Sequence, residues 1–292
     1  MALGFFDGVH IGHQAVIKAA VQNAKEYRRE AVVFTFNLPL GNSMKGGRLL
    51  SEEQKHHLMQ QMGVGHYMEP AFEDFCEYSP EAFVQQILHE MYHAKAVFCG
   101  ENFTFGKKAA GNIQTLRQLC HPLGIQVVTV PMSEYQGQPI SSTRIRAALQ
   151  QGEMEAVNAM LGRPYAIDFS IQKGHGLGRT LGFPTVNQIY PDGFAQPKFG
   201  IYITRIRVGE QWYAGATGFG NRPTVNKGDE GATCETFIVD YEGQLYGKQL
   251  QLEFYRYLAP TRKFDNLQQL TDCIHDAAQQ AKAYFSGDTT TK

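Results

Sequence analysis

The stretch from Leu3 to Gln14, LGFFDGVHIGHQ, predicts the fold of the first half of the chain. A very short apolar strand runs into a glycine-rich turn that carries His10 and His13, and a helix is expected from Gln14 to Tyr27. A helix N-terminus presents unpaired backbone N–H groups and a partial positive charge, which suit a phosphate. Gly12 would let that backbone approach phosphate oxygens, and the imidazoles would stabilise charge on a transferred group. The alternative is a tight turn whose histidines are only polar surface.

Apolar runs of strand length alternate with amphipathic helices through this half. Residues 31–36, 95–99 and 125–130 are short and rich in β-branched or aromatic residues, which predicts buried strands. Between them, Phe83 to Tyr92 repeats apolar residues at the spacing of one buried helical face, with Met91 on that face. Strands that alternate with helices predict a parallel α/β sheet of the Rossmann-like kind.

The second half changes to strands separated by turns rich in Gly, Asn and Asp, followed by one helix over about residues 266–284. This pattern predicts an antiparallel β-barrel or sandwich with a terminal helix. A helix ends at Gly162, and the proline that follows blocks its continuation, so we expect domains at residues 1–162 and 163–292. The expected strands are Tyr165–Gln172, Gly200–Gly209, Gln211–Gly218, Cys234–Asp240 and Gln249–Leu258.

Composition excludes several classes of protein. The chain has 292 residues, 27 Lys and Arg against 28 Asp and Glu, and a net charge of −1, so no basic field for nucleic acid is expected. The apolar stretches fall short of the roughly 20 residues that span a bilayer, and no secretory signal is recognised. The five cysteines form no CxxC pair, which favours reduced thiols. We expect a cytoplasmic protein without a membrane partner, either a monomer or a weak homo-oligomer.

A second anion-binding segment lies at residues 139–146, PISSTRIR. Ser142 and Thr143 stand at the start of an expected helix, and Arg146 lies on its first turns. Hydroxyl and N–H groups at a helix start, together with Arg, favour phosphate recognition. An ordinary N-cap with exposed arginines is the alternative. Two such segments in one α/β domain favour a nucleotide.

The second half has its own glycine-rich segment, residues 173–187, KGHGLGRTLGFPTVN. Its glycines, Gly174 and Gly178 among them, would wrap backbone donors around ATP phosphates, beside Arg179. Thr185 and Asn187 carry oxygen ligands suited to Mg²⁺. A glycine-rich turn is the alternative for the first part of the segment alone.

Glu235 is the candidate general base of this half. It alternates with Phe237 and Val239 on an expected strand, so we expect it to point inward as a partly desolvated carboxylate. A buried carboxylate on an apolar face is costly unless it is paired or functional. A salt bridge at the barrel end is the alternative.

Nearly the whole chain resembles bacterial bifunctional riboflavin kinase/FAD synthetases, whose first module is an HxGH nucleotidyltransferase. The family's GxFDGxHxGH loop is matched by residues 4–13, its SSTxIR segment by 141–146 and a GxDFxFG segment by 100–106. The resemblance implies that histidines and Arg146 bind ATP phosphates while the FMN phosphate attacks the α-phosphorus. The nucleotide-binding set is then Gly4, Phe5, Phe6, Asp7, Gly12, Ser142, Thr143 and Arg146.

The second half resembles the family's riboflavin kinase module. Residues 178–187 are similar to GRxLGFPTAN, and Glu235 stands where the family has its catalytic base. The resemblance implies phosphorylation of riboflavin to FMN with ATP and Mg²⁺. Flavin contacts are expected at Asn102, Arg222, Arg262 and Phe264. Arg222 is alternatively expected to lock its own loop by pairing with Asp240.

The sequence departs from the family at three places in its first half. Asn37 replaces an acid of an FDPHP-like segment, Asn102 replaces an Asp, and few residues precede Gly4. Two hypotheses follow. The favoured one is an enzyme that makes both FMN and FAD; the other is a riboflavin kinase or flavin-binding regulatory protein with an inactive adenylyltransferase domain.

Overall fold

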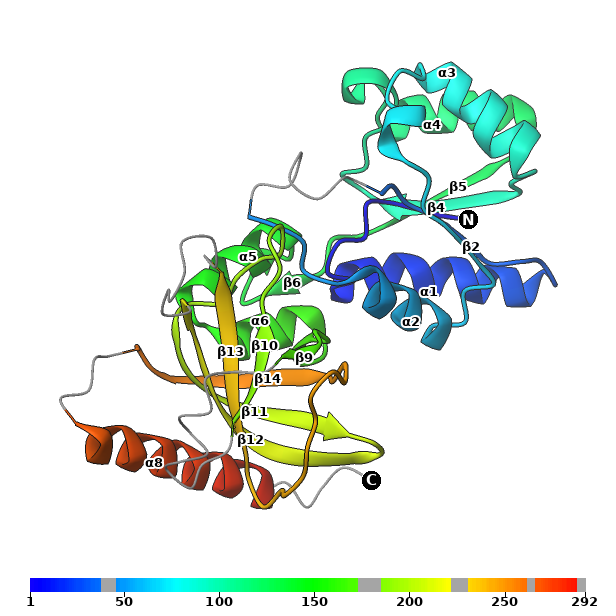
Figure 1. Ribbon diagram of the computed structural model, residues 1–292. Coiled ribbons are helices and arrows are strands. Elements are labelled where there is room, and N and C mark those ends of the chain that lie inside the picture. The colour runs from blue at the N-terminus through cyan, green and yellow to red at the C-terminus, as the bar shows by residue number, and fades with distance from the viewer. Residues whose placement is uncertain (38–45, 173–184, 222–230, 262–265, 288–292) are drawn as a thin grey trace. The chain divides into compact units, whose positions relative to one another are not determined.

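The structure is a computed structural model that describes residues 1–37, 46–172, 185–221, 231–261 and 266–287. The chain divides into two compact units. Unit 1 comprises Met1–Met44 and Glu52–Ser142, and unit 2 comprises Lys45–Ser51 and Thr143–Lys292. Figure 1 shows strands with flanking helices in the first unit and a curled set of long strands in the second.

Unit 1 contains a five-stranded parallel sheet in the order β3-β2-β1-β4-β5. The strands are β1 (Ala2–Leu3), β2 (Val32–Phe34), β3 (His66–Met68), β4 (Ala96–Gly100) and β5 (Gln126–Val130). β2 and β5 lie within the predicted apolar runs, β4 ends one residue beyond the run at 95–99, and β1 leads into the glycine-rich loop as expected. The prediction that the strand at 125–130 is buried is wrong, because β5 is an edge strand whose residues are partly or fully exposed. The parallel α/β fold predicted from the alternation of strands and helices is therefore confirmed.

Helices connect these strands: α1 (Ile11–Glu26), α2 (Glu52–Gln61), α3 (Pro80–Ala82), the π-helical segment η2 (Phe83–Met91) and α4 (Ile113–Cys120). Three short 3₁₀ segments, η1 (Phe72–Asp74), η3 (Lys107–Ala109) and η4 (His121–Leu123), and the hairpin β6 (Glu134–Tyr135)–β7 (Gln138–Pro139) complete the unit. Leu3 and Val97 from the sheet pack with Leu88 and Leu116 from the helices in one core.

The prediction that Met91 lies on a buried helical face is wrong, because its side chain is 56% exposed. The N–H of Tyr92 bonds to the carbonyl of Ile87, five residues earlier, as a π-helix requires. The wider turn shifts each successive residue relative to an α-helix. Phe83 and Ile87 stay in the core while Met91 rotates out of it.

Unit 2 is a curled antiparallel sheet of seven strands in the order β8-β14-β11-β12-β13-β10-β9. The strands are β8 (Tyr165–Ile167), β9 (Ile171–Gln172), β10 (Thr185–Ile189), β11 (Gly200–Val208), β12 (Gln211–Asn221), β13 (Ala232–Ile238) and β14 (Leu252–Ala259). The terminal helix α8 (Leu267–Ser286) packs against β11 and β12. The predicted β-barrel domain with a terminal helix is confirmed as a half-barrel.

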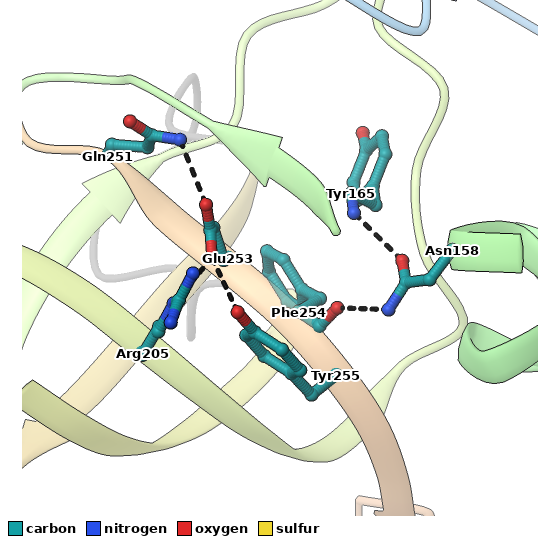
Figure 2. Close-up of polar contacts among 7 residues, drawn as sticks. All are labelled: Asn158, Tyr165, Arg205, Gln251, Glu253, Phe254 and Tyr255. Carbon is teal, nitrogen blue, oxygen red and sulfur yellow. Dashed lines mark hydrogen bonds and ion pairs between the residues drawn. The ribbon is translucent and has the colours of Figure 1, made fainter. Parts of the chain in front are cut away.

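Two helices precede the half-barrel, α5 (Ser142–Gln151) and α6 (Met154–Leu161), and Gly162 caps α6 with a φ of +69°. Asn158 of α6 donates from Nδ2 to the Phe254 carbonyl at 2.9 Å and accepts from the Tyr165 N–H at 2.8 Å (Figure 2). Because α6 is hydrogen-bonded to β14 and β8, it belongs to unit 2. Unit 1 ends at Ser142, and the domain boundary expected after Gly162 stays a prediction.

Candidate functional site

The loop between β1 and α1 is a strained turn. Phe6, Gly8 and Val9 have φ values of +48°, +78° and +40°. A β-branched residue such as Val9 rarely adopts this left-handed conformation. Strain of this kind persists only where the surroundings hold it, and it is common at ligand sites.

His10 and His13 are brought together at the start of α1. His10 is its N-cap residue, with Nδ1 accepting from the His13 backbone N–H at 3.3 Å, and the two rings stack 3.5 Å apart. Because Nδ1 acts as an acceptor, a neutral His10 ring carries its proton on Nε2. His10 is buried, and the His13 ring meets the edge of Phe6.

The glycines of this loop are required by packing within it. A Cβ on Gly12 would lie 3.3 Å from the His10 ring, and one on Gly4 would lie 2.8 Å from the Phe6 ring. Gly12 therefore makes room for the paired histidines, which is a second reason for a glycine there beside the predicted approach of phosphate.

The SSTxIR segment is divided between the units. The Ser142 hydroxyl donates to the Asp7 carbonyl at 2.8 Å, so Ser142 contacts the glycine-rich loop. Thr143 is exposed and Arg146 is buried, and both belong to unit 2. Arg146 Nε donates to the Gly47 carbonyl at 2.6 Å.

Two of the three departures from the family, Asn37 and Asn102, have different surroundings in unit 1. Asn37 Nδ2 donates to Glu52 Oε1 at 3.3 Å, and an aspartate there would face that carboxylate with like charge. Asn102 is exposed after β4, and its Oδ1 would lie 3.1 Å from a Cβ on Gly100. The neutral residue at position 37 thus fits its neighbour.

In unit 2, three predicted site residues share one face of neighbouring strands. Thr185 and Asn187 are two apart on β10, and Asn187 stands directly opposite Glu235 on β13. On the other side, Glu235 pairs with Gly218 of β12, which carries no side chain. The Glu235 carboxylate therefore has the Asn187 side chain on one side and, on the other, a residue without a side chain.

The prediction that Glu235 points into the barrel is wrong, because the residue is exposed. Cys234 and Thr236 point inward instead, and the Thr236 hydroxyl bonds to that of Thr217 at 2.8 Å. Buried hydroxyl groups that satisfy one another fill the interior without an ionised group. Phe237 lies on the outer face with Glu235, where it packs with α8.

Cys234, the residue before the candidate base, carries a thiol that stays protonated. Complete burial raises the pKa of the Cys234 thiol. The side chain therefore stays a neutral apolar group within the barrel, and the ionisable side chain on the open face at this level is Glu235.

Six predicted site residues lie outside the described residues: Gly174, Gly178, Arg179, Arg222, Arg262 and Phe264.

Sequence reasoning missed the side chains outside the glycine-rich loop that bond to its backbone carbonyls. Thr35, just after β2, donates to the Phe5 carbonyl at 2.8 Å, and Gln14 of α1 donates to the Val9 carbonyl at 3.0 Å. Lys55 of α2, paired with Glu69 at 2.5 Å, also lies near the Phe5 ring. A polar Thr35 at the end of an apolar run was the only sequence signal.

The described ranges contain no group of three or more His, Cys, Asp and Glu side chains placed to hold a metal ion. Thr185 and Asn187 are a different donor set, hydroxyl and amide oxygen on one strand face beside a carboxylate. Hard oxygen donors of this kind fit Mg²⁺, which takes few protein ligands and keeps waters and phosphate oxygens.

Within the described part of the chain, no helix has the length and apolar character to cross a bilayer.

An α/β unit with a histidine-bearing loop at a helix N-terminus, followed by a half-barrel with oxygen ligands and a carboxylate on its open face, defines a two-domain transferase that uses nucleotides. The sequence model of the FAD synthetase family matches residues 1–144, and that of the riboflavin kinase family matches residues 161–285. The chain belongs to the bifunctional riboflavin kinase/FMN adenylyltransferase family.

Relatives of that name cover nearly the whole chain. The protein of Listeria monocytogenes is 34% identical over 98% of this chain and 92% of its own. That of Haemophilus influenzae is 30% identical over 98% of this chain and 94% of its own. A crystal structure titled as a macrolide-efflux protein from Streptococcus pneumoniae is similar with a TM-score of 0.84 and 26% identity, over 95% of this chain and 93% of that one.

Proposed function

We propose that the chain phosphorylates riboflavin to FMN in unit 2 and transfers an adenylyl group from ATP to FMN in unit 1, producing FAD. One observation carries the proposal. Each unit holds its own constellation of candidate residues, the paired histidines in one and the Asn187–Glu235 pair in the other. Each constellation also lies within the stretch matched by one of the two family models.

In unit 1, a phosphate oxygen of FMN attacks the α-phosphorus of ATP, and the bond to the leaving pyrophosphate breaks. His10, with its proton on Nε2, and His13 donate hydrogen bonds to the developing negative charge. The N-terminus of α1 adds its partial charge, and Ser142 of the same unit contributes its hydroxyl group to the phosphate site. The loop residues Gly4 to Asp7 lie beneath the nucleotide, and Asn102 contacts the flavin.

In unit 2, the ribityl hydroxyl oxygen attacks the γ-phosphorus of ATP, ADP leaves, and the hydroxyl proton passes to Glu235. The pairing of Glu235 with Gly218 supports this role, because Gly218 places no side chain beside the carboxylate. Positioning of the hydroxyl supplies most of the effect, with proton transfer adding to it.

Mg²⁺ would be held by Thr185 and Asn187, and when bound it would neutralise charge on the phosphate oxygens of ATP. Gly174, Gly178 and Arg179 are proposed to contact the same nucleotide, and Arg222, Arg262 and Phe264 the flavin. The adjacent positions of Thr185, Asn187 and Glu235 on one face support the metal assignment.

Product analysis tests the proposal. The purified chain is incubated with riboflavin, ATP and Mg²⁺, and riboflavin, FMN and FAD are separated and quantified. We expect FMN to form first and FAD to follow. Accumulation of FMN without FAD would contradict the adenylyltransferase assignment and favour the alternative of an inactive first domain.

Two variants separate the activities. Glu235→Gln should lower FMN formation on the order of 10²–10⁴-fold while FAD still forms from supplied FMN. His10→Ala should lower FAD formation by about 10²-fold and leave FMN formation unchanged. Glu242→Gln, at another exposed glutamate of unit 2, is the matched control for the loss of charge. A Glu235→Gln chain that phosphorylates riboflavin at the wild-type rate would show that this carboxylate is not the base.

Thr185→Val tests the metal assignment. It should raise the Mg²⁺ concentration needed for half-maximal FMN formation, because one oxygen ligand is lost. FAD formation from FMN in the same samples is the internal control. An unchanged Mg²⁺ dependence would reject Thr185 as a ligand.

A further inference from the structure

The glycine-rich loop of unit 1 is held by three side chains that each bind a backbone carbonyl. Thr35 Oγ1 donates to the Phe5 carbonyl at 2.8 Å, and Ser142 Oγ donates to the Asp7 carbonyl at 2.8 Å. Gln14 Nε2 donates to the Val9 carbonyl at 3.0 Å. These donors come from the end of β2, the start of α5 and the first turn of α1. Every second carbonyl from Phe5 to Val9 is thus fixed from outside the loop.

Fixing a carbonyl also fixes the N–H of the next residue, because the trans peptide is planar and its oxygen and hydrogen point to opposite sides. The N–H groups of Phe6, Gly8 and His10 therefore point away from the three donors. His10 is also the residue that caps α1 and stacks on His13. The three side chains thus set the direction of loop amides next to the candidate phosphate-binding histidines.

The strain of the loop explains why such support is needed. Phe6 and Val9 have φ values of +48° and +40°, which side chains other than glycine rarely adopt. A loop left to itself would relax from this conformation, since each such residue is unfavourable in isolation. The hydrogen bonds to the carbonyls of Phe5, Asp7 and Val9 oppose that relaxation.

We propose that Thr35 and Gln14 are positioning residues for adenylyl transfer, which hold the loop in the conformation that receives the phosphates of ATP. The inference rests on the proposed function of unit 1. Neither residue touches the reacting atoms in this account; both act through the carbonyl groups of Phe5 and Val9.

Of the two residues, Thr35 allows the clearer test. Its side chain is completely buried, and its own N–H donates to the Met68 carbonyl at 3.0 Å, so its backbone continues the pairing of β2 with β3. Valine has nearly the same shape but lacks the hydroxyl group. Among the described residues, that hydroxyl group bonds to the carbonyl of Phe5.

The test measures FAD formation from FMN and ATP in the full chain, without riboflavin, as a function of ATP concentration. Thr35→Val leaves the Phe5 carbonyl without its buried donor, and we expect kcat/KM for ATP to fall by about tenfold. A rise in KM for ATP should account for most of the loss, and Thr35→Ser, which keeps the hydroxyl group, should restore it. FMN formation from riboflavin, in unit 2, should not change.

Thr129→Val is the matched control. Thr129 lies on β5 of the same unit, and its hydroxyl accepts from Arg117 at 3.1 Å, away from the loop. This variant loses a hydroxyl hydrogen bond without affecting a loop carbonyl, so its kcat/KM should equal that of the wild type. A loss as large as that of Thr35→Val would overturn the proposal, because it would show that general destabilisation of unit 1 is responsible.

Gln14→Met keeps the proposal testable if Thr35→Val lowers the thermal midpoint. It removes the donor to Val9 from a partly exposed position on α1 and should raise the KM for ATP as Thr35→Val does. Wild-type kinetics in both variants, or in Gln14→Met when Thr35→Val does not fold, would overturn the proposal. A wild-type chain that makes no FAD would instead refute the proposed function itself, and this inference with it.

Discussion

Replacement of Arg205 by methionine should destabilise the half-barrel, because the buried Glu253 carboxylate would lose its charged partner. Arg205 Nε lies 2.6 Å from Glu253 Oε2, and the two side chains are 33% and 9% exposed. Tyr255 and Gln251 also donate to this carboxylate, at 2.7 and 3.2 Å (Figure 2). Burial and the Glu253 carboxylate raise the pKa of Tyr255, so its hydroxyl remains a donor.

The magnitude follows from what is lost. Removing one partner of a buried ion pair costs about 3–5 kcal/mol, and a charge-assisted hydrogen bond about 1.5–3 kcal/mol. Water reaches the guanidinium of Arg205, and two donors remain on Glu253, so the lower range applies. Loss of the contact between Arg205 and the Trp212 ring, 4.4 Å away, adds about 0.5 kcal/mol. We expect about 2 kcal/mol, or a melting temperature lower by about 4–8 °C.

Trp212 provides the assay, because it is the single tryptophan of the chain and lies on β12 of unit 2. Its fluorescence during heating therefore reports unfolding of this unit alone, and the midpoint is compared because Arg205 also affects the intensity. Glu253→Gln should cost less than Arg205→Met, since the partly exposed guanidinium keeps its contacts with water and with the Trp212 and Tyr255 rings. A larger loss for Glu253→Gln, or an Arg205→Met midpoint equal to the wild type, would refute the reasoning.

Three further predictions concern packing and titration. A Cβ on Gly200 would overlap the Tyr257 ring, so Gly200→Ala should cost about 1–3 kcal/mol in Trp212-monitored unfolding, and an unchanged midpoint would contradict this. Asn158→Ala should cost about 1–3 kcal/mol in the same assay, because a buried carbonyl and N–H lose their partner; a loss near zero would show that water replaces the side chain. Burial raises the pKa of Cys99 from 9.0 to about 11, so its neutral thiol stabilises unit 1 fully below pH 9.0. That contribution is lost as pH rises from 9.0 to about 11, which urea unfolding followed by circular dichroism would detect as a falling free energy; a constant value would argue against a buried thiol.

Much of the fold was predictable because local patterns and tertiary packing agree. Apolar runs with β-branched residues marked β2 and β4, since a strand buried on both faces has to be apolar throughout. The same signal marked β5, although it is an edge strand that stays partly exposed. The strand β3, His66–Met68, was missed because it is a short, partly exposed edge strand without that signal. The glycine-rich loop was found from its residues, but its dependence on Thr35 was not, because the two lie far apart in sequence.

Assignment of residues to units also depended on tertiary contacts. Residues 45–51 precede α2 of unit 1, yet Arg48 N donates to the Gly193 carbonyl at 2.8 Å and the segment belongs to unit 2. No local property of the segment indicates this, because its partners Gly193 and Phe194 are distant along the chain. The π-helical turn that exposes Met91 differs from an α-helical turn because its hydrogen bonds reach five residues back instead of four. The spacing of apolar residues does not distinguish these two kinds of turn.

The sequence by itself determined the two-part organisation, the parallel and antiparallel sheets, the paired histidines at a helix start, and the alternation that joins Thr185 to Asn187. Only the tertiary structure decided which face of β13 is covered. Alternation defines two faces but does not say what packs on each, and here α8 covers Phe237 on the outer face while Thr217 meets Thr236 inside. Glu235 was therefore expected in the core and lies on the open face, because an ionised carboxylate stays solvated where the sheet leaves it uncovered.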